Sequence, residues 1–335
     1  MWLDCPEAVP INGWLDRLKT FAGRWVPFVP LSEQRAIEHF ARRRGYAVAE
    51  VLCWGRTCRL HKEGKDYLFK RTGPNGLIAY RDVLPAVDGD FKRLVLPRFV
   101  DGGHQSGIGH WIISRWLEGR NFNDRWDEWK PEVCGGKGIA LDYVDVLLDV
   151  LEDLRGVEAS PFAAGGIERR TRSFLCSRIR GQLDRALQGS LLTAGQERRA
   201  LDLLEPFLAR VDSGRLRLSN HDFYFRNFLE MPRGRIGILD WDAARISTYE
   251  IEHCVTYLWM LMWNHSAWSA ALLEGARSRF ALDRHQVRAA LLVNLLNQSM
   301  HVWPNRPELS RMLLATFLEA LDDAGFSAIW RGRNR

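Results

Sequence analysis

The sequence lacks any long apolar run, and no secretion signal of the usual kind opens it. Asp4 and Glu7 interrupt the first residues, and no apolar segment of the kind found in signal peptides follows them. The most apolar window, residues 255–263, is far shorter than the roughly 20 residues that a helix needs to cross a bilayer. We therefore expect a cytoplasmic protein without a transmembrane segment, in which this window forms a buried helix.

Cysteine is scarce, and the six cysteines form no Cys-x-x-Cys pair. Neither a zinc site nor a disulfide framework is therefore indicated, and reduced thiols are the simplest account. No internal repeat is present. With 46% hydrophobic and 26% charged residues the chain has the composition of an ordinary globular protein, and its 335 residues allow one large domain or two lobes.

Acidic residues are fewer than basic ones, and the net charge of +6 means that the surface attracts anions. A nucleotide, an anionic substrate and an anionic membrane surface all satisfy this condition. Arginines gather at residues 42–44 and within residues 169–180, although a solvated helix face is the simpler explanation of both clusters. No basic strand interleaved with aromatics and no recognition helix is present, so we expect no nucleic-acid partner.

Hydrophobic patterning divides the chain into three regions. Residues 1–45 form an N-terminal extension with several prolines and one helix. Residues 46–117 alternate short apolar runs with turns and predict a small sheet. Residues 118–335 are mainly helical. The expected strands are residues 48–54, 58–61, 67–70, 95–100 and 111–116, and the expected helices are residues 32–44, 77–86, 141–154, 196–211, 251–262, 286–300 and 308–324.

Residues 220–245 hold the most informative pattern of the chain. Asp222 is followed by Asn227 after five positions and by Asp240 at the end of an apolar run. This order suits phosphoryl transfer from a magnesium-bound nucleotide. One carboxylate accepts the proton of an attacking hydroxyl, while an amide oxygen and a second carboxylate hold the metal on the phosphates. A polar turn and a hairpin that contain these residues by chance are the alternative.

The flanks of this pattern predict a hairpin. Short apolar stretches at residues 228–229 and 236–239 lie on either side of a turn that contains proline and glycine. A hairpin here places Asn227 just before one strand and Asp240 just after its partner. Both side chains then lie at one edge, where they can share an ion.

This segment resembles the catalytic loop and metal-binding segment of the protein-kinase-like phosphotransferases, especially the aminoglycoside and choline kinase branch. That branch typically has His-Gly-Asp or His-Asn-Asp, four residues, Asn, and later Ile-Asp-Phe or Ile-Asp-Trp. The resemblance implies that Asp222 is the catalytic base and that Asn227 and Asp240 are the magnesium ligands. Asn220 occupies the usual His position and His221 is shifted by one place, so either residue is a candidate for supporting the loop backbone.

The resemblance covers about residues 46–265. It implies an α+β, bilobal protein-kinase-like fold with a β-rich nucleotide-binding N-lobe, a larger helical C-lobe, and ATP and Mg²⁺ as cofactors. Lys70, at a strand end, resembles the lysine that binds the α- and β-phosphates, and an exposed strand-end lysine is the alternative. In the family an acid on the next helix holds this lysine. Asp82 is the only acid between Gly76 and Val87 and is therefore the candidate.

Residues 112–119 resemble the hinge between the lobes, which makes Trp116 and Leu117 candidate walls of the adenine pocket. A buried structural tryptophan is the alternative there. The glycine-rich loop that covers the phosphates in the family is reduced to Gly55. Trp241 resembles a packing aromatic of the family, and we expect Asp242 to accept a backbone hydrogen bond or to assist a second Mg²⁺.

The acceptor is less well defined than the reaction. The basic chain and its arginine-rich tail argue against a polycationic aminoglycoside. An aromatic cage for a quaternary ammonium group needs tryptophans such as Trp259, Trp263, Trp268 and Trp303, which are more simply core residues. Residues 221–224 resemble the loop of the lipopolysaccharide core sugar kinases, which act on anionic glycolipid at the inner membrane face. We therefore expect a small-molecule, sugar or glycolipid hydroxyl as acceptor, with peripheral membrane contact as a further expectation.

Two other classes remain as alternatives. A protein kinase would need an Ala-Pro-Glu segment and room for a long activation loop after Asp240, and the sequence has neither. A non-catalytic scaffold is consistent with Asn220 and with the sparse glycine loop. It gives no chemical reason to keep Asp222, Asn227 and Asp240 together.

Overall fold

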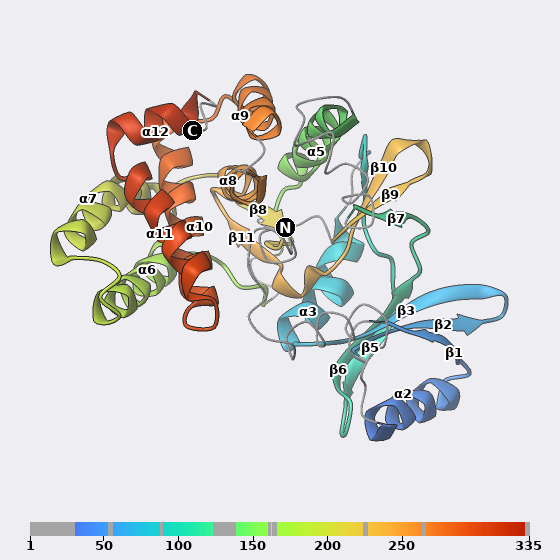
Figure 1. The fold of residues 1–335 in the computed structure, drawn as a ribbon. Coiled ribbons are helices and arrows are strands. Elements are labelled where there is room, and N and C mark those ends of the chain that lie inside the picture. Colours follow the sequence, from blue (N-terminus) through green and yellow to red (C-terminus); the bar gives the residue numbers. More distant parts are fainter. Residues whose placement is uncertain are drawn as a thin grey trace.

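The computed structural model describes residues 31–52, 56–87, 90–122, 139–159, 162, 166–223, 227–262 and 266–331. Four sequence-based expectations lie outside these ranges, namely the first 30 residues of the N-terminal extension, the loop at Gly55, Trp263 and the tail after Arg331. A strand-rich N-terminal part is followed by a mainly helical C-terminal part (Figure 1). The predicted α+β, bilobal class is therefore confirmed.

An antiparallel five-stranded sheet forms most of the N-terminal part. Its strands are β1 (Ala47–Val51), β2 (Thr57–Lys62), β3 (Lys65–Thr72), β5 (Phe99–Gln105) and β6 (Gly109–Arg115). Their order in the sheet is β1-β2-β3-β6-β5. Glu63 and Gly64 join β2 to β3 and both have positive φ, which is the backbone of a tight two-residue hairpin turn.

Helix α2 (Leu31–Arg43) covers one face of this sheet (Figure 1). The aromatic ring of Phe40 packs against Phe69 of β3 and Trp111 of β6, with ring centroids 5.2 and 4.7 Å apart. The helix ends before Gly45, whose φ of +78° is the left-handed conformation that glycine adopts without strain. Its bounds agree with the predicted helix to within one residue.

The opposite face of the sheet is covered by one continuous run of helical turns. It consists of α3 (Pro74–Ile78), a π-helical turn (Ala79–Val83) and a 3-10 turn (Leu84–Ala86). Sequence patterning predicts an ordinary helix over residues 77–86, whereas the run starts three residues earlier, with Pro74 at a first-turn position that suits proline. Pro85, which lacks an N–H group, lies in the 3-10 turn that ends it.

Two smaller sheets carry the segment that contains the candidate catalytic residues. The first has β4 (Leu94–Val95), β10 (Arg235–Ile238), β9 (Phe228–Met231) and β7 (Arg120–Asn121) in that order. The second pairs β11 (Arg245–Ser247) with β8 (Arg217–Ser219). The predicted hairpin after Asp222 is thus present as the antiparallel pair β9–β10, joined by a 3-10 turn at Pro232–Gly234.

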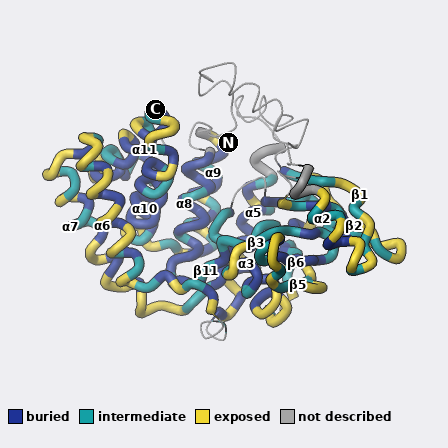
Figure 2. The backbone as a smooth tube through the Cα atoms, turned by 90° about the horizontal axis from the view of Figure 1, so that it is seen from below, coloured by how far each residue is buried: buried dark blue, intermediate teal, exposed yellow. Residues whose placement is uncertain are grey.

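Helices make up the rest of the described chain (Figure 1). They are α5 (Ile139–Gly156), α6 (Arg172–Gln188), α7 (Ala194–Arg210), α8 (Glu250–Met262), α9 (Ser266–Phe280), α10 (Arg284–Val302), α11 (Pro307–Ala320) and α12 (Asp323–Trp330). Helices α8 and α10 are buried along most of their length (Figure 2). Trp259 and Trp268 are core residues, which excludes both from an aromatic cage. Among the described helices, none has the length and apolar character required to span a bilayer.

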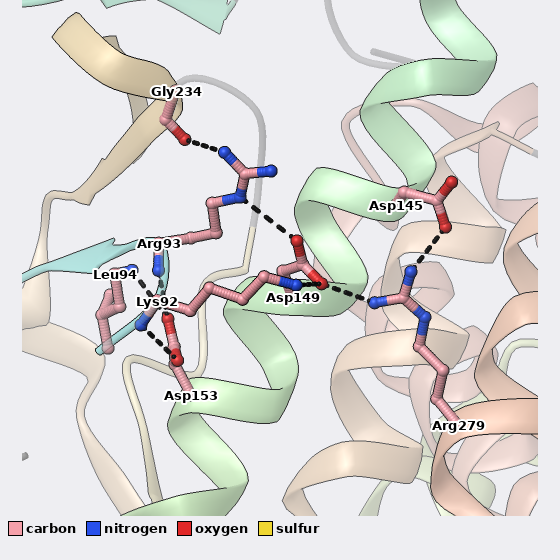
Figure 3. Close-up of polar contacts among 8 residues, drawn as sticks. All are labelled: Lys92, Arg93, Leu94, Asp145, Asp149, Asp153, Gly234 and Arg279. Atoms are coloured by element: carbon pink, nitrogen blue, oxygen red, sulfur yellow. Dashed lines mark hydrogen bonds and ion pairs between the residues drawn. The ribbon is translucent and has the colours of Figure 1, made fainter. Parts of the chain in front are cut away.

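A cluster of ion pairs fastens β4 to α5 and α9 (Figure 3). The buried carboxylate of Asp149 accepts hydrogen bonds from Lys92, Arg93 and Arg279 at 2.8, 3.2 and 2.7 Å. One turn along α5, Asp153 accepts from the three successive backbone N–H groups of residues 92–94. Because β4 pairs with β10, this cluster holds the strand that leads to Asp240 against the helical part.

Replacing Asp149 with Asn should lower the free energy of unfolding by about 1.5–3 kcal/mol, the range for hydrogen bonds to charged groups. Burial alone would raise the pKa of Asp149, but its three cationic partners outweigh burial and lower the pKa. The carboxylate's contribution is therefore complete above its ordinary pKa of about 3.9 and is lost as pH falls through the lowered folded value.

Thermal unfolding at neutral and acidic pH measures this effect. Asp145→Asn is the matched control, because Asp145 lies on the same helix, is 72% exposed and has Arg279 as its one ion-pair partner among the described residues. We expect little change in that control. Equal losses in the two variants would contradict a special role for the buried carboxylate.

Candidate active site

The loop after β8 brings two predicted residues into direct contact. The side-chain amide of Asn227 donates to the backbone carbonyl of Asp222 and to its Oδ2, each at 2.9 Å. This bond fixes the carboxylate and leaves its second oxygen for an incoming group. Because the amide nitrogen faces Asp222, the amide oxygen of Asn227, the atom that binds a metal, is turned away from the base.

Asn220 performs the backbone support for which it and His221 were both candidates. Its side chain is fully buried, and its amide donates to the carbonyls of Asp222 at 3.3 Å and Leu239 at 3.4 Å. These bonds tie the loop of the candidate base to the strand end that precedes Asp240. The loop is therefore connected although Asn220 stands where the phosphotransferases that the segment resembles typically have His.

His221 has a different place in the loop. It adopts a positive φ of +58°, and its backbone N–H donates to Ser219 Oγ at 2.8 Å. Its ring stacks on His253 of α8 with centroids 4.0 Å apart. Burial lowers the pKa of His253 to about 3 and lowers the pKa of His221 well below its ordinary value, so both rings are neutral at pH 7.

The β9–β10 hairpin places Asn227 and Asp240 at one edge, as predicted. Phe228 pairs with Ile238, and the backbone N–H of Leu239 donates to the carbonyl of Asn227 at 2.7 Å. Asp240 then adopts the left-handed conformation, with φ of +56°, which Asp tolerates better than most residues. Its side chain is 43% exposed, so the carboxylate is accessible to an ion or a ligand.

Lys70 of β3 reaches across to the same segment. Its Nζ lies 2.6 Å from Asp240 Oδ1 and 3.0 Å from Asp242 Oδ2, and its side chain is only 12% exposed. Burial alone would lower the pKa of this lysine, but Tyr80, Asp240 and Asp242 outweigh burial and raise it. The lysine is therefore charged and links the N-terminal sheet to the candidate metal segment.

The assignment of Asp82 as the partner of Lys70 is wrong in this structure. Asp82 is exposed and forms a two-pronged ion pair with its neighbour Arg81, with both N–O distances 2.7 Å. The reason is the helical period, since Tyr80 and Val83 face the core and leave Asp82 on the outer side. No acid of this helical run reaches the lysine, and Asp242 takes that place.

Asp242 is held by residues that sequence reasoning did not identify. Thr72 donates its hydroxyl to Asp242 Oδ1 at 2.7 Å, and Asn75 donates to the carbonyl of Asp242 at 2.8 Å. A Cβ at Gly76 would lie 2.0 Å from Thr72 Oγ1 and 2.5 Å from Asp242 Oδ1. Among the described residues, the groups that contact its carboxylate are the side chains of Thr72 and Lys70, and no backbone N–H of the kind expected donates to it. The sequence feature that could have identified Asp242 as a partner of Lys70 is its position two residues after Asp240.

Replacing Gly76 with Ala should displace Thr72 and Asp242 and so disturb the contact of Asp242 with Lys70. Overpacking of this kind lowers the free energy of unfolding by about 1–3 kcal/mol, and the disturbed Lys70 should bind Mg-ATP more weakly. Gly73→Ala is the control, because a Cβ there meets nothing within 4 Å and its φ of −92° suits any residue. Calorimetric titration measures both variants, and equal affinities would contradict the role of this contact.

The predicted hinge residues follow β6 directly. Trp116 donates its backbone N–H to the carbonyl of Asp66 at 3.2 Å, and its ring faces the guanidinium of Arg59 at 5.0 Å. Leu117 approaches Gly237 of β10, three residues before Asp240. Both residues are half-buried, and their contact with an adenine remains a prediction.

The donor set suits a magnesium ion that is bound together with phosphates. Mg²⁺ needs only one or two carboxylates when phosphate and water fill its other positions. Asp240 supplies an accessible carboxylate and Asn227 an amide oxygen at the same hairpin edge. Within the described ranges, no group of three or more His, Cys, Asp or Glu side chains could hold a metal by itself. The residues present therefore fit a metal that arrives with a nucleotide.

The chain has the protein-kinase-like fold of the aminoglycoside phosphotransferases, as comparison with solved structures shows. Aminoglycoside phosphotransferase APH(4)-Ia is 17% identical, with a TM-score of 0.60, and the match covers 90% of this chain and 100% of that chain. A thermostable mutant of that protein, in ternary complex with AMP-PNP and hygromycin B, is 16% identical, with a TM-score of 0.61 and coverages of 85% and 98%.

A third similar structure is the GDP complex of aminoglycoside 2'-phosphotransferase-IIIa. It is 17% identical, with a TM-score of 0.55, and the match covers 89% of this chain and 99% of that chain. No protein-family model matches the sequence. No curated protein matches it either.

Proposed function

We propose that this protein is a magnesium- and ATP-dependent phosphotransferase that transfers the γ-phosphoryl group to a hydroxyl of a small molecule or sugar. The observation that carries the proposal is the convergence of Lys70 with Asp240 at 2.6 Å, beside a loop in which Asn227 holds Asp222. Similar structures that contain AMP-PNP and hygromycin B, or GDP, support the same reaction class.

Each residue has a definite task in this reaction. Bound Mg²⁺ would neutralise the phosphates and would be held by Asp240 and the amide oxygen of Asn227. Lys70 supplies a fixed positive charge for the α- and β-phosphates from a rigid strand. Asp222, oriented by Asn227, accepts the proton of the acceptor hydroxyl.

The two other classes fit the structure less well. Only four residues separate Asp240 from β11, and α8 begins at Glu250, which leaves no room for a long peptide-binding activation loop. A non-catalytic scaffold would have no use for a buried lysine paired with two carboxylates. A glycolipid acceptor and contact with an anionic membrane stay predictions.

Transfer of the γ-phosphoryl group tests the proposal. Purified protein is incubated with Mg-ATP and pools of sugars, sugar phosphates and glycolipids, and phosphorus NMR follows new phosphate monoesters. We expect a Mg²⁺-dependent product in at least one pool and none with Lys70→Ala. Equal product in the wild type and this variant would contradict the proposal.

A further inference from the structure

His221, the residue directly before the candidate base, has a backbone conformation that few residue types adopt readily. Its φ is +58°, in the left-handed region where a Cβ comes too close to the following carbonyl oxygen. The phosphotransferases that this segment resembles typically have Gly or Asn here, and these two residue types enter the region most easily. Other residues stay in it only when their surroundings hold them. The contacts of His221 therefore decide the course of the loop into Asp222.

Helix α8 reaches this loop with two successive residues. The helix packs against β8, the strand that leads into the loop (Figure 1). Cys254 Sγ lies 3.7 Å from Ser219 Oγ, and the same oxygen accepts the backbone N–H of His221 at 2.8 Å. The ring of His253 lies flat on the ring of His221, with centroids 4.0 Å apart and 13° between the ring planes. The backbone of His221 is thus held through Ser219, and its side chain is held by α8 itself.

His253 has a fixed place, because it lies between packed helices. The residue is 3% exposed. Its backbone carbonyl accepts from the side-chain amide of Asn294 on α10 at 3.1 Å, and that amide also donates to Thr256 Oγ1 at 2.9 Å. The ring of Tyr257, one turn along α8, is nearly parallel to the ring of His253, with centroids 5.9 Å apart. The stack therefore connects the loop to the packed pair of α8 and α10.

Core packing alone is the other interpretation of the His253 ring. It implies that any side chain of similar volume can replace the imidazole without an effect on the loop, whereas a stack requires a flat ring. Charge does not oppose such a stack at neutral pH, because burial lowers the pKa of His253 to about 3 and lowers the pKa of His221 as well. The two interpretations therefore differ for ringless and aromatic residues at position 253.

We propose that His253 is a positioning residue for phosphoryl transfer, whose ring keeps His221 in the left-handed conformation and thereby sets the direction of the Asp222 carboxylate. The inference rests on the proposed function and adds a residue that acts through the loop. In the reaction the acceptor oxygen bonds to the γ-phosphorus, ADP leaves with the electron pair of the broken bond, and the hydroxyl proton passes to Asp222. Asn227 holds this carboxylate at Oδ2, and the histidine stack fixes the residue before it.

His253→Leu and His253→Phe separate the ring from the volume that it fills. Leucine fills a similar volume without a flat ring, and phenylalanine keeps the ring. Mg-ATP is the probe, with water as the acceptor. Because a displacement of about 1 Å can lower a rate by about 10²-fold, His253→Leu should lower kcat for hydrolysis by about 10- to 100-fold with a nearly unchanged KM for Mg-ATP. His253→Phe should recover most of this loss.

Leu261→Ala is the control for a weakened α8. Leu261 is 4% exposed and lies more than two turns further along the same helix. Truncation there should lower the melting temperature and leave kcat at the wild-type value. Lowered stability without lowered kcat in His253→Leu, or equal kcat in the leucine and phenylalanine variants, overturns the proposal. His253→Gln, which also lacks a ring, replaces the leucine variant if that variant does not fold.

A double-mutant cycle with His221→Gly tests whether His253 acts through His221. Glycine adopts a positive φ without a contact to hold it. In that background His253→Leu should cause little further loss of kcat, so the two substitutions should be far from additive. An equal loss in both backgrounds means that His253 acts by another route and overturns the proposal.

Hydrogen exchange at the His221 amide gives a readout that needs no turnover. This amide donates to Ser219 Oγ, and its protection should fall in His253→Leu and be retained in His253→Phe and Leu261→Ala. Unchanged protection in His253→Leu overturns the proposal. A wild-type protein that neither hydrolyses nor transfers phosphate contradicts the proposed function, and the exchange result then decides alone whether the stack holds the loop.

Discussion

Replacing Asp222 with Asn should lower kcat for phosphoryl transfer by about 10²–10⁴-fold, the usual contribution of a general base, while the dissociation constant for Mg-ATP stays nearly unchanged. The amide is close in size to the carboxylate and can still accept from Asn227 through its oxygen. It cannot take the proton of the acceptor hydroxyl. The loss therefore belongs to the chemical step, and single-turnover kinetics with bound nucleotide would measure it.

Asp202→Asn is the control for this experiment. Asp202 is exposed on α7, so the substitution makes the same change of charge away from the loop. Its kcat should equal that of the wild type. An Asp222→Asn enzyme that turns over at the wild-type rate would remove Asp222 from the mechanism and leave the nucleotide site in place.

Replacing Trp241 with Ala should lower the free energy of unfolding by about 3–5 kcal/mol, the typical cost of truncating a buried large aromatic. Trp241 is 1% exposed, and its indole N–H donates to the carbonyl of Ile238 at 2.9 Å. It directly follows Asp240, so the cavity would also loosen the candidate metal ligand. We expect weaker Mg-ATP binding in any fraction that remains folded.

Urea unfolding of Trp241→Ala beside Trp241→Phe separates packing from the hydrogen bond. The phenylalanine variant keeps much of the ring volume and loses the indole donor, whose net contribution is about 0.5–1.5 kcal/mol. It should therefore lie much nearer to the wild type. A loss below about 1 kcal/mol in the alanine variant would contradict the packing role.

Local sequence was sufficient to predict the backbone of the candidate catalytic segment. Asn227 and Asp240 lie on the two ends of one short hairpin, and alternating apolar residues with a turn between them specify such a unit. The hairpin of β2 and β3, which places Lys70 next to the N-terminal core, is likewise specified by alternating apolar residues with a turn between them. The expected strands at residues 58–61, 67–70 and 111–116 match β2, β3 and β6 to within two residues, whereas the single strand expected at residues 95–100 covers the end of β4 and the start of β5, which lie in different sheets.

Contacts between distant segments could not be predicted in this way. Lys70 and Asp240 are 170 positions apart, and so are Thr72 and Asp242. The choice of Asp82 relied on the family's usual helix acid, and the actual helical phase turned that residue outwards. Asp242 can approach Lys70 because Gly76 has no side chain and leaves space for the Asp242 carboxylate. No local sequence pattern reveals such a space.

The arginines within residues 169–180 are a further case in which contacts between distant segments could not be predicted from local sequence. Residues 169–180 appear in the sequence as a basic helix face, for which solvation is the simpler explanation. The structure separates them, because Arg170 is buried beside β11 while Arg180 stays exposed on α6.

The most direct test of the account is the thermal stability of the wild type, Lys70→Ala and Asp240→Ala with ATP, in the presence and absence of Mg²⁺. A nucleotide at a hundredfold excess over its dissociation constant stabilises a fold by about 2.7 kcal/mol. We expect this Mg²⁺-dependent shift for the wild type and its loss in both variants. No shift in the wild type, or an equal shift in all three proteins, would contradict a nucleotide site built on Lys70 and Asp240.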